Sequence, residues 1–219
     1  MPEVDLLKSY PKTKRQDLLE TREKVSEAER RIAKQFGQEY FDGPRRLGLG
    51  GYNYHPKYFK QVVRDFADYY SLASNCSILD VGSGKGFMLK DFRDLLPDSF
   101  LRGIDISQYC YDNCLPEIKD CLLIGSCDHL PFQDKEFDLV ISIATIHNLD
   151  LDGVKRSLKE IIRVSKGNSY IKVNGYKTEA EKKALFRWNL VAETILPVSQ
   201  WLEIFDEVGY RGDYSFFAT

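Results

Sequence analysis

The sequence lacks a long apolar segment and any strong excess of charge. Its most apolar stretch, residues 139–146, is far shorter than the roughly 20 residues that a helix needs to cross a bilayer. The first residues contain no long apolar core of a secretory signal. Lys and Arg number 31 against 33 Asp and Glu, a net charge of −2, which gives no strong field for a polyanion. We therefore expect a cytoplasmic protein that neither enters a membrane nor binds nucleic acid through charge.

Cysteine is also scarce, with five residues in 219. An odd count in a chain without a signal favours reduced thiols over disulfides. Four of the cysteines and one histidine cluster in the sequence, at Cys110, Cys114, Cys121, Cys127 and His129. No C-x-x-C knuckle occurs among them, and they are expected on different elements, so we predict buried free thiols and no metal site.

The N-terminal part is dense in charge and free of proline from residue 13 to residue 40. Thr13 and Gln16 have capping-box spacing, and apolar residues recur every seven positions at Leu18, Val25 and Ile32. This pattern predicts one helix with a narrow apolar stripe. The main interpretation is a helix that lies on its own domain. A coiled-coil homodimer is the alternative, although charged residues occupy the other seam positions.

A loop rich in glycine and tyrosine follows at residues 43–56, with four glycines and two prolines. Its aromatic residues are unlike a solvated linker. We expect Tyr52 to cover a ligand, and Arg45, Arg46 and Tyr54 to contact an acidic group or the substrate. Residues 1–55 are accordingly predicted to form an N-terminal helix and a lid loop, and residues 56–219 the main domain.

From residue 56 onward, short apolar runs alternate with amphipathic segments of helical period. The expected strands are 77–81, 100–106, 121–125, 137–143, 169–173 and 214–218. The expected helices are 56–70, 87–96, 107–115, 154–164, 179–196 and 199–208. This alternation predicts an α/β fold of the Rossmann-like, doubly wound type, with a mostly parallel sheet and helices on both faces. Residues 175–198 would be a helical insertion.

The most informative segment is I-L-D-V-G-S-G-K-G-F at residues 78–87, between an expected strand and an expected helix. Its glycine spacing is G-x-G-x-G, whereas a dinucleotide fingerprint is G-x-G-x-x-G. Asp80 before the glycines would repel a pyrophosphate but suits a ligand with an ammonium group. Asp105 ends the next strand, where an acid can bind both ribose hydroxyls. A simple turn and a helix cap are the alternatives for these two features.

In these motifs the sequence resembles the class I S-adenosylmethionine-dependent methyltransferases over residues 56–175. The resemblance rests on L-D-V-G-S-G-K-G, on G-I-D-I-S and on the L-P-F and F-D-x-V segments within residues 125–143. It implies a sheet of order 3-2-1-4-5, with the cofactor across the carboxyl ends of strands 1, 2 and 4. The family usually closes its sheet with two antiparallel strands. Few residues remain after Val208, so we expect one of these strands to be missing or shortened.

The resemblance implies S-adenosylmethionine as cofactor and S-adenosylhomocysteine as product. Asp128, which precedes L-P-F, would bind the adenine amino group. The full set of expected cofactor-binding residues is Tyr52, Asp80, Gly82, Ser83, Gly84, Gly86, Asp105, Ile106, Cys127, Asp128, His129 and Ile143.

On the acceptor side, His147 follows strand four by four residues and is the candidate general base, because an unperturbed pKa of about 6.5 suits that role. Packing is the alternative. Asn148 and Trp188 are candidate substrate contacts, with helix capping the main alternative for Asn148.

We expect methyl transfer to oxygen or nitrogen of a small molecule. The loop at 45–54 and T-I-H-N-L at 145–149 resemble a bacterial branch linked to surface polysaccharides, which adds sugar, nucleotide-linked and phosphorylated acceptors. Nucleic-acid or protein methylation, a non-catalytic cofactor-binding scaffold and a dinucleotide oxidoreductase are the alternatives.

Overall fold

The computed structural model describes residues 3–11 and 25–217. Its centre is a sheet in which β3 (Leu122–Ile124), β2 (Phe100–Asp105), β1 (Ser77–Val81), β4 (Phe137–Ile143) and β5 (Ser165–Tyr176) lie side by side in that order. This is the order that the resemblance implied. β1 pairs in parallel with β2 on one side and β4 on the other, so the carboxyl ends of the three strands meet at one edge.

The far side of the sheet differs from the family pattern. β7 (Asp213–Phe217) pairs with β5 in parallel, and so does the short β6 (Leu196–Pro197). The shortened strand was expected, but the antiparallel direction was wrong, since every strand pair in the described part of the chain is parallel.

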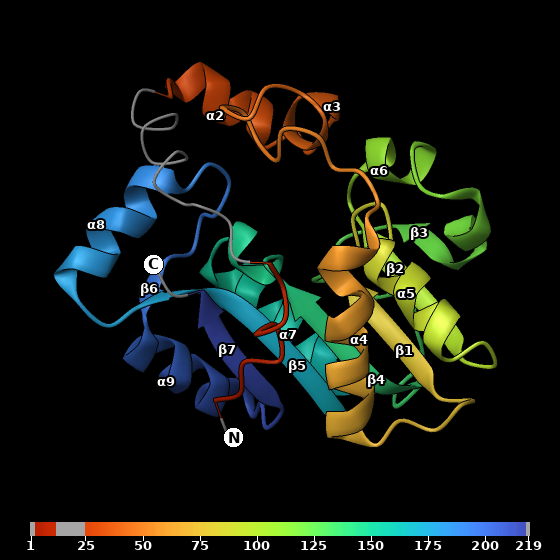
Figure 1. Cartoon of the computed structure of the whole chain (residues 1–219). Helices are drawn as coiled ribbons and strands as arrows, with labels where there is room; N and C mark the ends of the chain where they lie inside the picture. Colours follow the sequence, from red (N-terminus) through yellow and green to blue (C-terminus); the bar gives the residue numbers. More distant parts are fainter. Residues whose placement is uncertain (1–2, 12–24, 218–219) are drawn as a thin grey trace.

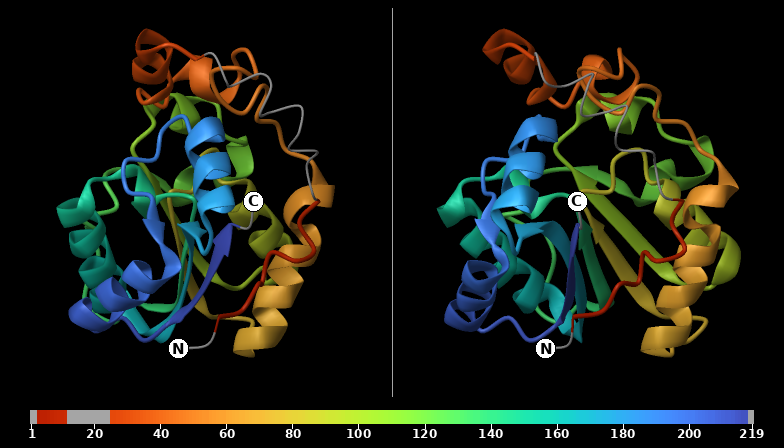
Figure 2. Two further views of the ribbon diagram at one scale, coloured as in Figure 1. Left: turned by 90° about the vertical axis from the view of Figure 1, so that its left-hand side faces the viewer. Right: turned by 60° about the vertical axis from the view of Figure 1, so that its left-hand side comes forward.

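Helices cover both faces of the sheet (Figures 1 and 2). On one face, α7 (Leu151–Val164) and α9 (Val198–Val208) bury residues such as Leu158, Ile161, Trp201 and Phe205 against the strands. On the other, α4 (Pro56–Tyr70) and α5 (Phe87–Leu95) do the same with Val62, Phe66, Leu89 and Phe92. Beyond residue 55, the remaining helices are α6 (Gln108–Asp112), the 3-10 helices η1 (Pro116–Cys121) and η2 (Ile146–Asn148), and α8 (Glu179–Trp188).

The helix expected to reach residue 196 ends at Trp188. Asn189 takes an extended backbone and makes two hydrogen bonds with the main chain of Ala192, which turns the chain into a loop. This competing side-chain bonding is typical of asparagine and ends the helix early.

Residues 3–10 pack in the core of the main domain, although they were predicted to belong to the N-terminal lid segment. The backbone N–H of Val4 donates to the carbonyl of Tyr214 at 2.9 Å, so this segment extends the sheet beyond β7. Leu6 and Leu7 are buried in the cluster beneath α4. The predicted N-terminal unit, residues 1–55, therefore combines residues 3–10, which pack in the core of the main domain, with the segment at residues 25–55 that is described next.

Residues 25–55, which we call the N-terminal arch, cross above the carboxyl edge of the sheet, from the α8 side to the α6 side (Figure 1). The arch contains α2 (Glu27–Ala33) and α3 (Gln38–Phe41). The single helix predicted over residues 13–40 is therefore wrong in its second half, because Phe36 has a φ of +49° and precedes Gly37. The predicted capping box at Thr13 and the stripe residue Leu18 lie outside the described residues.

The turn after β1 depends on Gly82. Its φ is +84°, and a Cβ atom there would lie 1.9 Å from Oγ1 of Thr145, in the loop after β4. The backbone N–H groups of Gly82 and Ser83 both donate to the carbonyl of Ile104, at 2.7 and 3.2 Å. The turn is thus held between β2 and β4, and only a residue without a side chain fits it.

We predict that Leu6→Ala lowers the free energy of unfolding by about 2–5 kcal/mol, because it leaves a cavity in the core. Urea denaturation measures this effect. Ile32→Ala is the control, since Ile32 is 37% exposed and its truncation should change stability little. Equal effects of the two substitutions would show that residues 3–10 are not part of the core.

Gly82→Ala should destabilise the protein by more than the roughly 1–2 kcal/mol that a left-handed backbone costs a residue with a side chain, because of the added clash. Gly209→Ala isolates the backbone cost, since Gly209 has a φ of +77° and open space at its Cβ position. Thr145→Ala should recover part of the loss in the double variant. If Gly82→Ala costs no more than Gly209→Ala by urea denaturation, the close packing with Thr145 is not rigid.

Candidate active site

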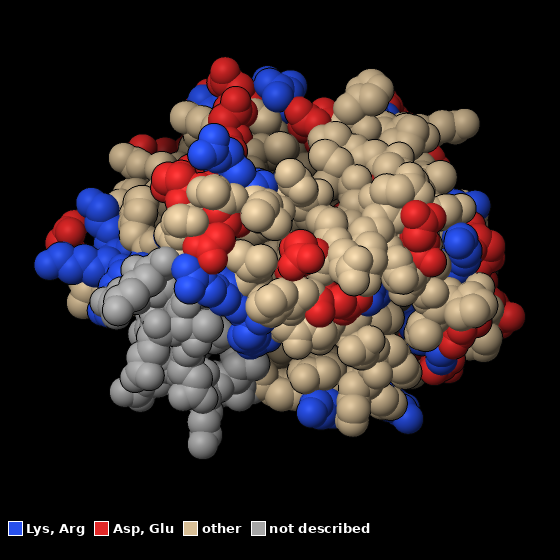
Figure 3. Space-filling view, turned by 90° about the horizontal axis from the view of Figure 1, so that it is seen from above, with Lys and Arg blue, Asp and Glu red and all other residues tan. Residues whose placement is uncertain are grey.

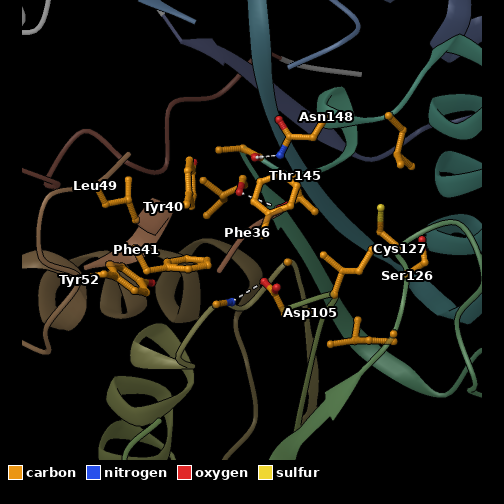
Figure 4. A pocket seen from close by; sticks show the side chains of 18 residues that line it. Phe36, Tyr40, Phe41, Leu49, Tyr52, Asp105, Ser126, Cys127, Thr145 and Asn148 are labelled. Atoms are coloured by element: carbon orange, nitrogen blue, oxygen red, sulfur yellow. Dashed lines mark hydrogen bonds between the residues drawn. The ribbon is translucent and has the colours of Figure 1, made fainter. Parts of the chain in front are cut away.

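A pocket of about 250 Å³ lies at the carboxyl edge of the sheet, between the strands and the N-terminal arch (Figure 4). Seven of the residues predicted to bind a cofactor line it: Tyr52, Gly82, Gly84, Asp105, Ile106, Cys127 and Ile143. The pocket therefore brings together residues from the arch and from the carboxyl ends of β1, β2, β3 and β4 or the loops that follow them. Predicted residues that do not line it are Asp80, Ser83, Gly86, Asp128 and His129.

Asp105 and the glycine turn form the floor of the pocket. One carboxylate oxygen of Asp105 accepts a 2.7 Å hydrogen bond from the backbone N–H of Gly84, and the other accepts from the N–H of Ser107 at 2.9 Å. Burial raises the pKa of Asp105, and these backbone N–H groups act against the rise. The cap of α6 is Ser107 and not Asp105, which was the alternative interpretation, and the Asp105 side chain faces the pocket (Figure 4).

Asp80 is a buried carboxylate at the end of β1, only 6% exposed. Burial raises its pKa to about 7, and the nearby charge of Asp105 adds to the rise. No described residue donates a hydrogen bond to this carboxylate. An ionised Asp80 is therefore costly unless a cation lies beside it.

The loop that follows β3 lines another side of the pocket with Gly125, Ser126 and Cys127. Asp128 next to them faces away, because its carboxylate accepts from Oγ of Ser126 at 2.5 Å and from Arg156 at 2.9 Å. These bonds, with the one from Ser126 strongest, lower the pKa of Asp128. The carboxylate that was predicted to bind the adenine amino group thus has two partners within the protein.

The N-terminal arch supplies an aromatic wall made of Phe36, Tyr40, Phe41 and Tyr52. A Cβ atom on Gly84 would lie 3.1 Å from Cε1 of Tyr52, so this ring rests on the glycine turn. Sequence reasoning found Tyr52 but missed the other three rings. The available signal was G-Q-E-Y-F-D-G at residues 37–43, where two glycines isolate a short aromatic segment.

The predicted substrate residues on the arch are engaged elsewhere. Arg45 donates to the carbonyl of Leu49, and Arg46 forms an ion pair with Glu29 at 2.7 Å. The hydroxyl of Tyr54 donates to Asp91 on α5 at 2.7 Å. None of these three side chains lines the pocket, and neither does Trp188 at the end of α8.

His147 does not have the surroundings expected of a general base. It lies in η2, 4% exposed, and its Nδ1 accepts from the backbone N–H of Asn174 at 3.2 Å. Burial lowers its pKa to about 3. The ring is absent from the pocket lining, so the predicted proton transfer to His147 has no geometric support.

Asn148, in contrast, lines the pocket opposite Asp105 (Figure 4). Its Nδ2 donates to the carbonyl of Ala144 at 3.2 Å, which fixes the plane of the amide. The helix cap that we considered for Asn148 is supplied by Asp150, whose side chain accepts from the N–H of Gly153. Thr145 and Ala144 complete this end of the pocket, at the end of β4.

The sequence predicted that the cysteines are buried free thiols. All five are free, and Cys76, Cys110 and Cys121 are buried. In the described ranges, no group of three or more His, Cys, Asp and Glu side chains is arranged to hold a metal ion. No helix within the described residues is both long enough and apolar enough to span a membrane.

A family model described as a methyltransferase domain matches residues 79–173. The tRNA (carboxymethyluridine(34)-5-O)-methyltransferase of Arabidopsis thaliana is 29% identical over 134 residues, which are 60% of this chain and 31% of that protein. The chain thus spans less than a third of the length of this relative.

Solved structures share the fold. The YcgJ protein of Bacillus subtilis has a TM-score of 0.55 at 17% identity, covering 65% of each chain. A putative methyltransferase from Haloferax volcanii, solved in complex with the Trm112 methyltransferase activator, has a TM-score of 0.51 at 21% identity, covering 68% of this chain and 71% of that one. The family's methyl donor is S-adenosylmethionine. With the strand order, the glycine turn and the strand-end acids, the match over residues 79–173 identifies this part of the chain as a class I S-adenosylmethionine-dependent methyltransferase domain.

Proposed function

We propose that the protein transfers a methyl group from S-adenosylmethionine to an oxygen or nitrogen atom of a small molecule. The observation that carries this proposal is the pair of neighbouring carboxylates, the buried Asp80 and the half-buried Asp105, beside the glycine turn at the floor of the pocket. A cationic ligand with hydroxyl groups satisfies both acids, whereas a pyrophosphate would be repelled by them.

The residues present fit this cofactor. The unpaired carboxylate of Asp80 suits the ammonium group, and the lone pairs left on Asp105 suit the ribose hydroxyls. Gly82 and Gly84 line the pocket and carry no side chains, so a ligand in the pocket can approach their backbone. Ile106, 60% exposed at the pocket edge, offers an apolar surface for the adenine. When bound, the cofactor supplies an electrophilic methyl group on sulfur.

The acceptor would then lie at the end of β4, between Asn148, Thr145 and the aromatic wall of the arch. Asn148 can orient it, because one N–H of its amide is used by Ala144 and a second remains. Most of the acceleration would come from alignment, since holding reactants in place can contribute about 7–11 kcal/mol. A sugar, nucleotide-linked or phosphorylated acceptor from surface-polysaccharide biosynthesis remains within this proposal, although Arg45 and Arg46 are engaged elsewhere.

A modified tRNA nucleoside is the second candidate acceptor, favoured by the likeness to the Arabidopsis enzyme. The aromatic wall could stack on a base. The face seen from above the arch carries acidic and basic side chains intermixed, without a continuous basic surface in the described part (Figure 3). We therefore place the small-molecule acceptor first. Labelled methyl transfer to tRNA and to small acceptors separates the two candidates.

We predict that S-adenosylhomocysteine binds and stabilises the protein, by about 2.7 kcal/mol at 100 times its dissociation constant. Asp105→Ala should weaken binding at least tenfold, because charge-assisted hydrogen bonds are each worth about 1.5–3 kcal/mol. Asp98→Ala is the control, since Asp98 is exposed. Calorimetry that shows binding of a nicotinamide dinucleotide and none of S-adenosylhomocysteine would refute the proposal.

Asp80 should make this binding depend on pH. Its raised pKa means that the carboxyl is largely protonated below about pH 7 in the free protein, whereas the ammonium group requires the ionised form. Affinity should therefore rise between pH 6 and 8, with proton release on binding. In the free protein, the contribution of Asp80 to stability is present below pH 4 and lost as pH rises through 7.

Calorimetry in two buffers of different ionisation enthalpy measures the proton release. Asp80→Asn should abolish most of it and should flatten the pH dependence of stability over the same range. Any proton release that remains in Asp80→Asn would come from Asp105, whose charge acts on Asp80 in the parent. Proton release that persists unchanged in Asp80→Asn would contradict the assignment of the ammonium group to Asp80.

A further inference from the structure

Lys85 lies inside the glycine turn, yet its side chain points to the arch rather than to solvent. Its Nζ donates to Oδ2 of Asp42 at 2.6 Å and to the carbonyl oxygen of Tyr52 at 2.8 Å. The Lys85 side chain is 5% exposed and that of Asp42 is 23% exposed. This is the most buried of the recorded ion pairs among the described residues.

Asp42 is the point at which three elements meet. Besides Lys85, it accepts from the backbone N–H of Tyr52 at 2.7 Å and from the hydroxyl of Tyr109 on α6 at 2.7 Å. Burial alone would raise the pKa of Asp42, but the bonds from Lys85 and Tyr109 outweigh it and hold the pKa below its ordinary value. The carboxylate therefore stays ionised in this network.

The network fixes the ring of Tyr52 over Gly84. Lys85 is adjacent to Gly84 in the chain and donates to the carbonyl oxygen of Tyr52, while Asp42 accepts from the N–H of the same residue. The floor and the aromatic wall of the pocket are thus connected by one buried ion pair. A buried pair is costly when it is broken, because it leaves an unpaired charge, so it favours a single closed arrangement.

We propose that Lys85 and Asp42 are positioning residues that couple closure of the N-terminal arch to cofactor binding. This inference rests on the proposed function. The arch has a second anchor, where Lys34 pairs with Glu193 at 3.0 Å and Ala33 packs on Leu190 and Val191. The Lys85–Asp42 pair thus controls whether the ring of Tyr52 packs on Gly84 in the glycine turn.

A rival role for Lys85 is direct pairing with the carboxylate of the cofactor's amino-acid part. The two roles differ in what Asp42 does. If Lys85 acts through the arch, loss of either partner opens the wall, and loss of both has no further effect. If Lys85 acts on the ligand, removal of Asp42 leaves binding intact or strengthens it. Ligands with and without the amino-acid part separate the roles as well.

The experiment compares Lys85→Met, Asp42→Asn and their double variant, with Lys155→Met as the control. Lys155 pairs with Glu207 at 2.7 Å, away from the pocket. Calorimetry gives the affinities for S-adenosylhomocysteine and for 5′-methylthioadenosine, which lacks the amino-acid part. Trypsin cleavage after Arg45 and Arg46, followed by mass spectrometry, reports on opening of the arch.

We expect each single variant to weaken both ligands by a similar factor, roughly 5- to 150-fold, the usual range of coupling between two sites. The double variant should be no weaker than the singles. Cleavage of the arch should be faster in these variants, and bound ligand should protect the parent but protect the variants less. Tyr109→Phe removes one bond to Asp42 and should shift both measurements less, in the same direction, even where Lys85→Met does not fold.

Loss of S-adenosylhomocysteine binding alone in Lys85→Met, with parental binding in Asp42→Asn, would overturn the proposal in favour of the rival role. Parental affinity in all three variants would overturn it as well. A parent protein that binds neither ligand would instead refute the proposed function itself, and the inference with it.

Discussion

The chain leaves the central strand β1 through Gly82, whose φ of +84° and contact with Thr145 leave no room for a side chain. Because β1 lies between β2 and β4, this turn touches both neighbours. Its N–H groups bind the carbonyl of Ile104 at the end of β2, and the next glycine, Gly84, binds the carboxylate of Asp105. The ends of the three strands are thereby held at one level, and the floor of the pocket follows from that constraint.

The same constraint concentrates charge. Asp80 and Asp105 lie at the ends of neighbouring strands, and burial raises the pKa of both. Two neighbouring carboxylates disfavour each other's ionised state, and desolvation adds to the penalty, so a cation beside them is favoured. On the opposite side of the turn, Lys85 and Asp42 bury charges of both signs and need no ligand.

Much of this arrangement could be predicted from the sequence, because it follows from local rules. Alternating strands and helices gave the parallel sheet, and the G-x-G-x-G spacing with Asp80 and Asp105 located the pocket. The end of α8 was misplaced because the side chain of Asn189 bonds the main chain of Ala192 and ends the helix. The ion pair of Asp128 with Arg156 of α7 joins distant residues, so no local pattern could predict it. The parallel direction of β7 depends on how α9 returns the chain, which no local pattern reports.

His147 shows why a residue type at the right position does not establish its role. Its ring and its main chain join three parts of the molecule: Nδ1 binds Asn174 on β5, and its carbonyl accepts from Glu193 and Thr194. The loop that contains Glu193 is also the one that anchors the arch, through Lys34. A charged imidazolium in this position would be buried without a counter-ion, so the neutral ring is the stable form. His147 therefore supports the loop that presents Thr145 and Asn148.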